Sequence, residues 1–127
     1  MANYGEQKCI ALTAASNSAA LKYTVMRYVA GGSMVLATAN ASSQAIGVLQ
    51  GTPALGDEGE VCYDGRSKVV TGAAVTDGAY ITHNTSGRAI AVVSGAMCIG
   101  KALTASGADG EIISALVFPP FRWSGAA

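Results

Sequence analysis

Charged and aromatic residues are scarce in this chain of 127 residues. Charged side chains make up 13% of it and aromatic side chains 6%, whereas a typical soluble domain is about 25% charged. Lys and Arg together number 8, as do Asp and Glu, so the formal net charge is zero. Nucleic-acid binding needs a basic surface, and this charge balance indicates none. A surface with so few charges is typical of a protein that contacts another protein.

Long apolar runs and targeting signals are also missing. No stretch approaches the roughly 20 apolar residues that a membrane-spanning helix needs. The first residues, MANYGEQK, lack the basic start and apolar stretch of a secretion signal. We therefore expect no membrane partner, and we expect the protein to be made and first folded in a cytosol.

Three cysteines and one histidine leave little for nucleophilic catalysis. Cys9, Cys62 and Cys98 are odd in number and form no Cys-x-x-Cys pair, so we interpret them as buried thiols in a reducing compartment. A thiol enzyme would need Cys98 or Cys62 beside His83, the single histidine. We favour a turn position for His83 and core positions for the thiols, and we assign no catalytic residue.

Acidic residues gather in two short segments, which raises the question of a metal site. Asp57, Glu58 and Glu60 lie close in sequence, as do Asp109 and Glu111. Neither segment has the alternating acidic ligands of a calcium loop, and the glycines match neither a phosphate loop nor a dinucleotide fingerprint. We interpret both segments as solvated turns, and we expect no metal and no cofactor.

An internal repeat is the most informative feature that the chain does contain. The sequence AIGVL at 45–49 is followed by GEV at 59–61, and CIGKAL at 98–103 is followed by GEI at 110–112. A Gly-rich segment separates the two motifs in each copy. A repeat of this kind indicates a duplicated structural unit, and we place the units at about residues 21–70 and 78–117.

Each unit is predicted to begin with a β-hairpin. Strands at 23–29 and 33–37 are joined by Gly31-Gly32, and strands at 79–83 and 88–93 are joined by a turn at 84–87. Short strands separated by turns about every 8 to 12 residues are typical of an all-β barrel or sandwich. The sequence therefore predicts an all-β domain.

Four glycines of the repeated motifs, Gly47, Gly59, Gly100 and Gly110, are interpreted as structural turn motifs. Glycine reaches positive φ angles where a side chain would clash. The sequence Asp64–Ser67 is predicted to be a further turn, which separates two strands of the first unit.

The two ends of the chain lie outside the repeat. We expect an N-terminal arm at 1–9, a single β domain at 10–117 and a C-terminal aromatic and proline tail at 118–127, whose Pro119 and Pro120 argue against a central strand. Aromatic residues with an arginine are typical of interface anchors, although the tail could equally fold back on its own domain. The candidate partner interface comprises Tyr4, Phe118, Phe121, Arg122 and Trp123.

The order of these motifs, from hairpin to IG strand to Gly-rich turn to GE strand, resembles the small phage head-decoration, or capsid cement, proteins. The resemblance extends from about Ala11 to Val117, and the tail goes beyond it. It implies a β-barrel or β-tulip fold and a position on the outer capsid surface of a virion made in the host cytoplasm. The implied partners are the major capsid protein and neighbouring copies in a homotrimer, which together clamp the shell.

Two alternatives remain beside a capsid decoration protein. One is another structural β protein of a phage, in the tail or at the head-joining position. The other is the thiol enzyme that uses Cys98 or Cys62 with His83.

Overall fold

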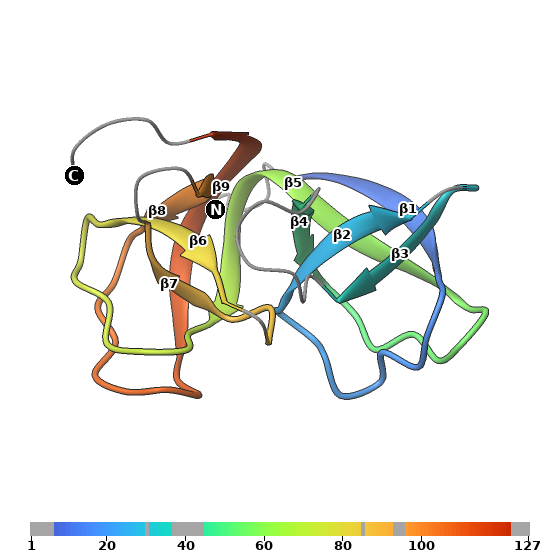
Figure 1. Ribbon diagram of the computed structural model, residues 1–127, viewed down its shortest axis with the longest axis horizontal. Helices are drawn as coiled ribbons and strands as arrows, with labels where there is room; N and C mark the ends of the chain where they lie inside the picture. Colours follow the sequence, from blue (N-terminus) through green and yellow to red (C-terminus); the bar gives the residue numbers. More distant parts are fainter. Residues whose placement is uncertain (1–6, 30, 37–44, 85, 93–95, 123–127) are drawn as a thin grey trace, which may run out of the picture.

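The computed structural model has an all-β fold, which confirms the predicted fold class (Figure 1). The model describes residues 7–29, 31–36, 45–84, 86–92 and 96–122. Over these ranges no helix has the length and apolarity to cross a membrane. The described residues form one sheet of nine strands: β1 (Lys8–Ala14), β2 (Val25–Val29), β3 (Ser33–Leu36), β4 (Ala45–Leu49), β5 (Glu58–Val70), β6 (Tyr80–His83), β7 (Ala89–Ala91), β8 (Met97–Ala102) and β9 (Ile112–Arg122).

The first half of the sheet closes on itself as a small barrel. Its strand order is β1-β3-β2-β4-β5, and β1 also pairs with β5. The contact that joins β1 to β3 is parallel and short, with Thr13 opposite Ser33 and Ala14 opposite Met34. A closed ring leaves no edge strand to aggregate, so β1 is the strand that completes this half.

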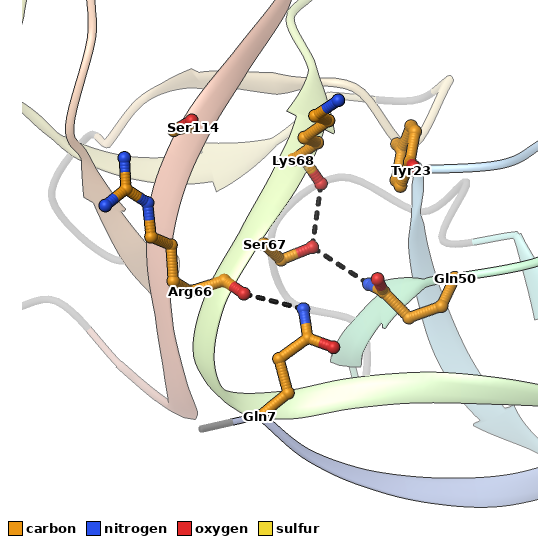
Figure 2. Close-up of a pocket in the computed structure, with 7 residues that line it drawn as sticks. All are labelled: Gln7, Tyr23, Gln50, Arg66, Ser67, Lys68 and Ser114. Atoms are coloured by element: carbon orange, nitrogen blue, oxygen red, sulfur yellow. Dashed lines mark hydrogen bonds between the residues drawn. The ribbon is translucent and has the colours of Figure 1, made fainter. Parts of the chain in front are cut away.

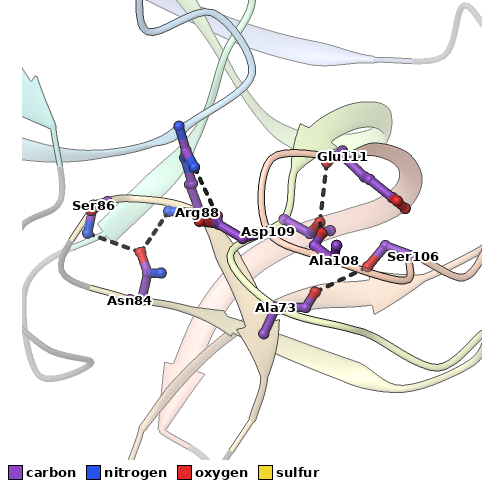
Figure 3. Close-up of polar contacts among 9 residues, drawn as sticks. Ala73, Asn84, Ser86, Arg88, Ser106, Ala108, Asp109 and Glu111 are labelled. Carbon is purple, nitrogen blue, oxygen red and sulfur yellow. Dashed lines mark hydrogen bonds and ion pairs between the residues drawn. The ribbon is translucent and has the colours of Figure 1, made fainter.

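The second half repeats this topology with β5-β9-β8-β6-β7. Its ring is nearly closed by a parallel bridge from Thr71, just beyond β5, to Ala89 in β7. Figure 3 shows the polar contacts around this closure, among them Asn84, whose side chain accepts hydrogen bonds from the amides of Ser86 and Arg88. The exposed pair of Arg88 and Asp109, 2.7 Å apart, adds little stability because solvent screens it.

Strand β5 belongs to both halves. Figure 1 shows it passing from the β1–β4 half to the β6–β9 half. Its first residues pair with β1 and β4, and its last six pair with β9 from Gly65–Val117 to Val70–Ile112. The predicted turn at Asp64–Ser67 is therefore wrong. Ladders with β1 and then with β9 keep the chain extended there, and Gly65, with a φ of 122°, accommodates the change of partner.

The IG motifs occupy equivalent positions in the two halves. Gly47 in β4 lies opposite Met26 of β2, and Gly100 in β8 lies opposite Ile81 of β6. Both glycines are inside strands, so their interpretation as turn residues is wrong. A Cβ on Gly47 would collide with the carbonyl oxygen of Cys62, which explains the glycine by close strand approach.

The GE motifs are not equivalent, although they align in sequence. Leu49 and Ala102 are equivalent, because each lies two residues after the glycine of its IG motif. Leu49 pairs with Val61, and Ala102 pairs with Ala115, so the counterpart of Val61 is Ala115 rather than Ile112. Gly59 lies within β5 and is not a turn residue. The true counterpart of the turn glycine Gly110 is Gly56.

Backbone hydrogen bonds establish this correspondence. The amide of Gly56 donates to the carbonyl oxygen of Ala14 at 2.9 Å, and the amide of Gly110 donates to that of Thr71 at 2.7 Å. Both glycines have positive φ angles, 86° and 92°. The structural duplication is therefore real, but the two GE motifs occupy different positions within the duplicated units.

Strands extend into both segments that the sequence predicted to be arms. Lys8 and Cys9 belong to β1, and β9 continues as far as Arg122, through both prolines. The prolines fit because the β8–β9 ladder is irregular there: Cys98 pairs with Phe121 and Gly100 with Val117, so two steps on β8 oppose four on β9. Residues 1–6 and 123–127 lie outside the described residues.

One hydrophobic core serves both halves. Its largest cluster combines Val25 and Val48 from the first half with Val69, Ile81 and Ile99 from the second. All five side chains are at most 1% exposed. The small apolar residues that dominate the composition fit between closely approaching strands, where large aromatic side chains would not.

We expect Gly47→Ala and Gly100→Ala each to lower the free energy of unfolding by about 1 to 3 kcal/mol. In each variant the new Cβ would meet a carbonyl oxygen of the neighbouring strand, that of Cys62 or of Leu116. Urea denaturation followed by circular dichroism measures the change. Gly51→Ala is the matched control, because nothing lies within 4 Å of its Cβ position. Equal stability of all three variants would contradict the close-approach explanation.

Candidate functional site

An aromatic patch lies on the outer face of the second half. We define it as Tyr80 on β6 with Leu116, Phe118 and Phe121 on β9. Lys101 of β8 pairs with both Tyr80 and Leu116, so these three side chains form a row across adjacent strands. Exposed fractions of 39% for Tyr80, 42% for Leu116 and 46% for Phe121 make this an apolar surface in contact with solvent.

Ring contacts hold the aromatic patch in a defined arrangement. The ring of Phe118 lies 6.5 Å from that of Tyr80, tilted by 56°, and 5.7 Å from that of Phe121, stacked at 28°. Phe118 also packs against the buried residues Val92 and Cys98. Pairs at these distances are favourable beyond their buried area, so the patch is ordered before any partner binds.

Lys101 places a positive charge at the edge of the aromatic patch. The Nζ atom of Lys101 lies 5.3 Å from the ring centroid of Tyr80, within the range of a cation–π contact. An apolar centre with a positively charged neighbour is the kind of surface that binds a protein partner through buried aromatic anchors.

The predicted interface residues fall into three groups. The structure brings Phe118 and Phe121 together in the aromatic patch, whereas Tyr4 and Trp123 lie outside the described residues. The backbone of Arg122 pairs with Met97 at the end of β9. Sequence reasoning missed Tyr80 and Leu116, because their proximity depends on the register of β6, β8 and β9. Their only local signal is exposure expected from strand alternation.

An apolar groove lies on the first half, next to the end of β9. Its volume is about 330 Å³ and its lining is almost wholly apolar. Pro119 contributes to it from β9, one residue from Phe118 of the aromatic patch. The other strands contribute Ile10, Leu12, Tyr28, Ala45, Ile46 and Tyr63.

A larger, polar cleft of about 460 Å³ lies where the two halves meet (Figure 2). The side chain of Gln7 donates to the carbonyl oxygen of Arg66 at 2.6 Å, and that of Gln50 donates to Ser67 Oγ at 2.8 Å. Ser67 in turn donates to the carbonyl oxygen of Lys68 at 2.9 Å. These bonds tie β4 and the start of β1 to the middle of β5, so we interpret the cleft as structural.

The cleft also contains the one non-glycine residue with a positive φ among the described residues, Tyr23 at 69°. Its counterpart in the second half is Gly78, because the amides of Tyr23 and Gly78 donate to Leu49 and Ala102 at 2.8 and 2.9 Å. A tyrosine in this conformation costs of order 1 kcal/mol or more. The duplicated backbone imposes that conformation at both positions.

The pKa shifts of the thiols and of the histidine are not those of an activated pair. Burial raises the pKa of Cys62 to about 11 and raises the pKa of Cys98. Burial also lowers the pKa of His83, which is 1% exposed and whose Nδ1 lies 3.0 Å from the carbonyl oxygen of Asn84. A reactive thiolate needs a lowered thiol pKa. The shifts run in the opposite direction.

Acidic residues line a third, open depression around the 50–60 segment, which includes Asp57, Glu58 and Glu60. Within the described ranges, no three His, Cys, Asp or Glu side chains come close enough together to hold a metal ion. In the second half, the carboxylate of Glu111 accepts a hydrogen bond from the amide of Gly107 at 2.8 Å, which is turn chemistry.

At neutral pH, Cys62 should react with iodoacetamide roughly 100-fold more slowly than a thiol of pKa 9.0, because a pKa of about 11 lowers its thiolate fraction by that factor. Peptide mapping by mass spectrometry measures the labelling, and the urea-unfolded chain is the control in which all three thiols react. Fast labelling of Cys62 or Cys98 in the native protein, lost in His83→Gln, would instead support a thiol enzyme.

Stability should fall as the pH is lowered from about 7 to about 5.5, by up to roughly 1.4 kcal/mol per pH unit from His83. The folded state lowers the pKa of His83 below its ordinary value of 6.5, so the unfolded chain takes up the proton first. Urea midpoints at each pH measure the effect. His83→Gln removes this titration, and an unchanged slope in that variant would show that another group is responsible.

Comparison with known proteins bears on the fold. Neither a protein-family model nor a curated protein sequence matches the chain. Among solved structures, the chain is similar to the N base of the head fiber protein gp8.5 of bacteriophage phi29. The TM-score is 0.65 with 17% sequence identity, and the match covers 87% of this chain and 93% of that chain. The likeness shows that this chain shares its fold with part of a phage head fiber protein.

Proposed function

We propose that this chain is a structural protein of a bacteriophage particle, which binds the outer surface of the head and stabilises the shell by bridging capsid subunits. The observation that carries the proposal is the shared fold with the N base of a phage head fiber protein, which extends over most of both chains. The resemblance of the IG and GE motifs to head-decoration proteins supports it independently. The proposed location is the virion, after synthesis in the host cytoplasm.

The aromatic patch is the proposed contact with the major capsid protein. Tyr80, Leu116 and Phe121 expose apolar surface, and the rings of Tyr80 and Phe121 are already ordered by packing on Phe118. An ordered apolar surface loses little side-chain entropy on binding. We also propose that Arg122, Trp123 and Tyr4 extend this contact, since Arg122 ends β9 and Trp123 is the next residue in the sequence.

Neighbouring copies of the chain are the second proposed partner, in a homotrimer. Each contact with the shell can be weak if several are made at once, because linked sites raise the effective concentration of the second contact. The low charge of the chain, 13% of residues, supports assembly on a protein lattice, since few charges need to be desolvated.

A second candidate function is the base of a longer fiber on the phage head. The observation that favours it is that the match covers 93% of a chain described as the N base of a head fiber protein. Electron microscopy of particles distinguishes the candidates: compact density at repeated positions favours decoration, and projecting fibers favour a base. Density confined to one vertex or to the tail would favour the head-joining or tail alternative.

We expect Phe121→Ser and Tyr80→Ser each to weaken binding to purified shells by about 30-fold or more, the effect of losing an aromatic anchor. Co-sedimentation of the purified protein with shells that lack it measures binding. Leu55→Ser is the matched control, because Leu55 is 67% exposed and lies in the turn before β5.

Circular dichroism and thermal unfolding establish that each variant is folded. Absence of co-sedimentation by the unmodified protein, with no gain in the heat resistance of the shells, would contradict the proposed function. Equal losses in all three variants would contradict the aromatic patch as the contact, while leaving head binding intact.

A further inference from the structure

Two of the three cysteines lie directly opposite each other in the sheet. Cys9 of β1 and Cys62 of β5 are partners in the antiparallel β1–β5 ladder. Opposed Cα atoms in such ladders are separated by about 4.5 or 5.5 Å, depending on the class of pair. Both values lie within the range of about 4.4 to 6.8 Å that disulfides span, so the backbone already has the required spacing.

Their side chains also lie on the same face of the sheet. Cys62 is fully buried in the main core cluster, and Cys9 packs against that same cluster from a partly exposed position. Each thiol also has a polar contact of its own: Cys9 Sγ lies 3.9 Å from Gln7 Oε1, and Cys62 Sγ lies 3.7 Å from the carbonyl oxygen of Asp64. Burial raises the pKa of both thiols, and the proximity of each thiol also shifts the pKa of the other. The third thiol, Cys98, is buried in a different cluster.

We propose that Cys9 and Cys62 form a reversible cross-strand disulfide, which fastens β1 to β5 when the protein meets an oxidising environment. The oxidant is a low-molecular-weight disulfide such as oxidised glutathione. The thiolate of the more accessible Cys9 attacks one sulfur of that disulfide and releases one thiol. The thiolate of Cys62 then attacks Cys9 Sγ in the mixed disulfide and releases the second thiol. Two protein thiols are thereby oxidised and one small disulfide is reduced to two thiols.

The position of the pair gives the disulfide a structural effect. Strand β1 completes the first ring by pairing with both β3 and β5, and its residues Ile10 and Leu12 line the apolar groove. A bond from Cys9 to Cys62 encloses β1 from Cys9 onward, together with β2, β3 and β4, in one covalent loop. Such a loop restricts the unfolded chain and stabilises the fold, and it prevents β1 from separating from the ring.

The proposed function predicts when the disulfide forms: the thiols are reduced during folding and oxidised later. Only this timing rests on the proposed function. A reducing cytosol keeps both thiols free during folding, and release from the cell exposes the particle to oxidants. The disulfide would then add stability after assembly. The test below uses the isolated chain, so its failure leaves the capsid-binding proposal untouched.

The experiment treats the reduced full-length chain with oxidised glutathione at about pH 8.5, where a larger fraction of Cys9 is thiolate. We expect the intact mass to fall by two hydrogen atoms and peptide mapping to link Cys9 with Cys62. The thermal midpoint should rise by on the order of 10 °C, and a reducing agent should reverse both changes. Cys98→Ser should behave in the same way.

Cys9→Ser is the decisive control, because residue 9 is partly exposed and the variant should still fold. This variant should show neither the mass loss nor the rise in midpoint. Labelling of the fully unfolded chain first establishes that all three thiols are free at the start. A stable glutathione adduct on Cys9 of the unmodified chain, a disulfide between two chains, or no reaction of the folded chain with oxidised glutathione would each overturn the proposal.

Discussion

The structure depends on one strand that pairs along almost its whole length, with a single register shift opposite Lys8 and Cys9. The first residues of β5 carry the ladders to β1 and β4, and its last residues carry the ladder to β9. Because hydrogen-bonded partners are present on both stretches, the local turn signal of Asp64-Gly65 is overridden. The two rings therefore share a strand and a core and cannot separate without breaking β5 out of one of them.

Close approach of strands is the second constraint. Gly47 and Gly100 are needed because a carbonyl oxygen of the neighbouring strand occupies the space of a Cβ. The same backbone geometry in both halves places Tyr23 and Gly78 at equivalent positive φ angles. The tyrosine accepts a strained conformation because hydrogen bonds to Leu49 and Val70 hold its backbone in place.

The aromatic patch and the apolar groove both depend on this sheet for their positions. The β8–β9 ladder is irregular at its end, so β9 accommodates two prolines there. In the same region Phe118 packs against Tyr80 and Phe121. Neighbouring residues of β9, Phe118 and Pro119, contribute to the aromatic patch and to the apolar groove. This ordered apolar surface supports the proposed attachment to a protein shell, whereas the raised pKa of the buried thiols is opposite to the shift that activates a thiol nucleophile.

The sequence by itself determined the all-β class, the duplication and the hairpins, because strand alternation and turn residues act over a few positions. It also placed Phe118 and Phe121 among the interface candidates. Only the tertiary structure decided that Gly56 is the counterpart of Gly110 and that β5 runs through the predicted turn at Asp64–Ser67. It also decided that Tyr80 lies opposite Lys101 and Cys9 opposite Cys62. The physical reason is register: ladders between strands far apart in the chain set which residues oppose each other, and a shift of a few residues leaves local sequence patterns unchanged.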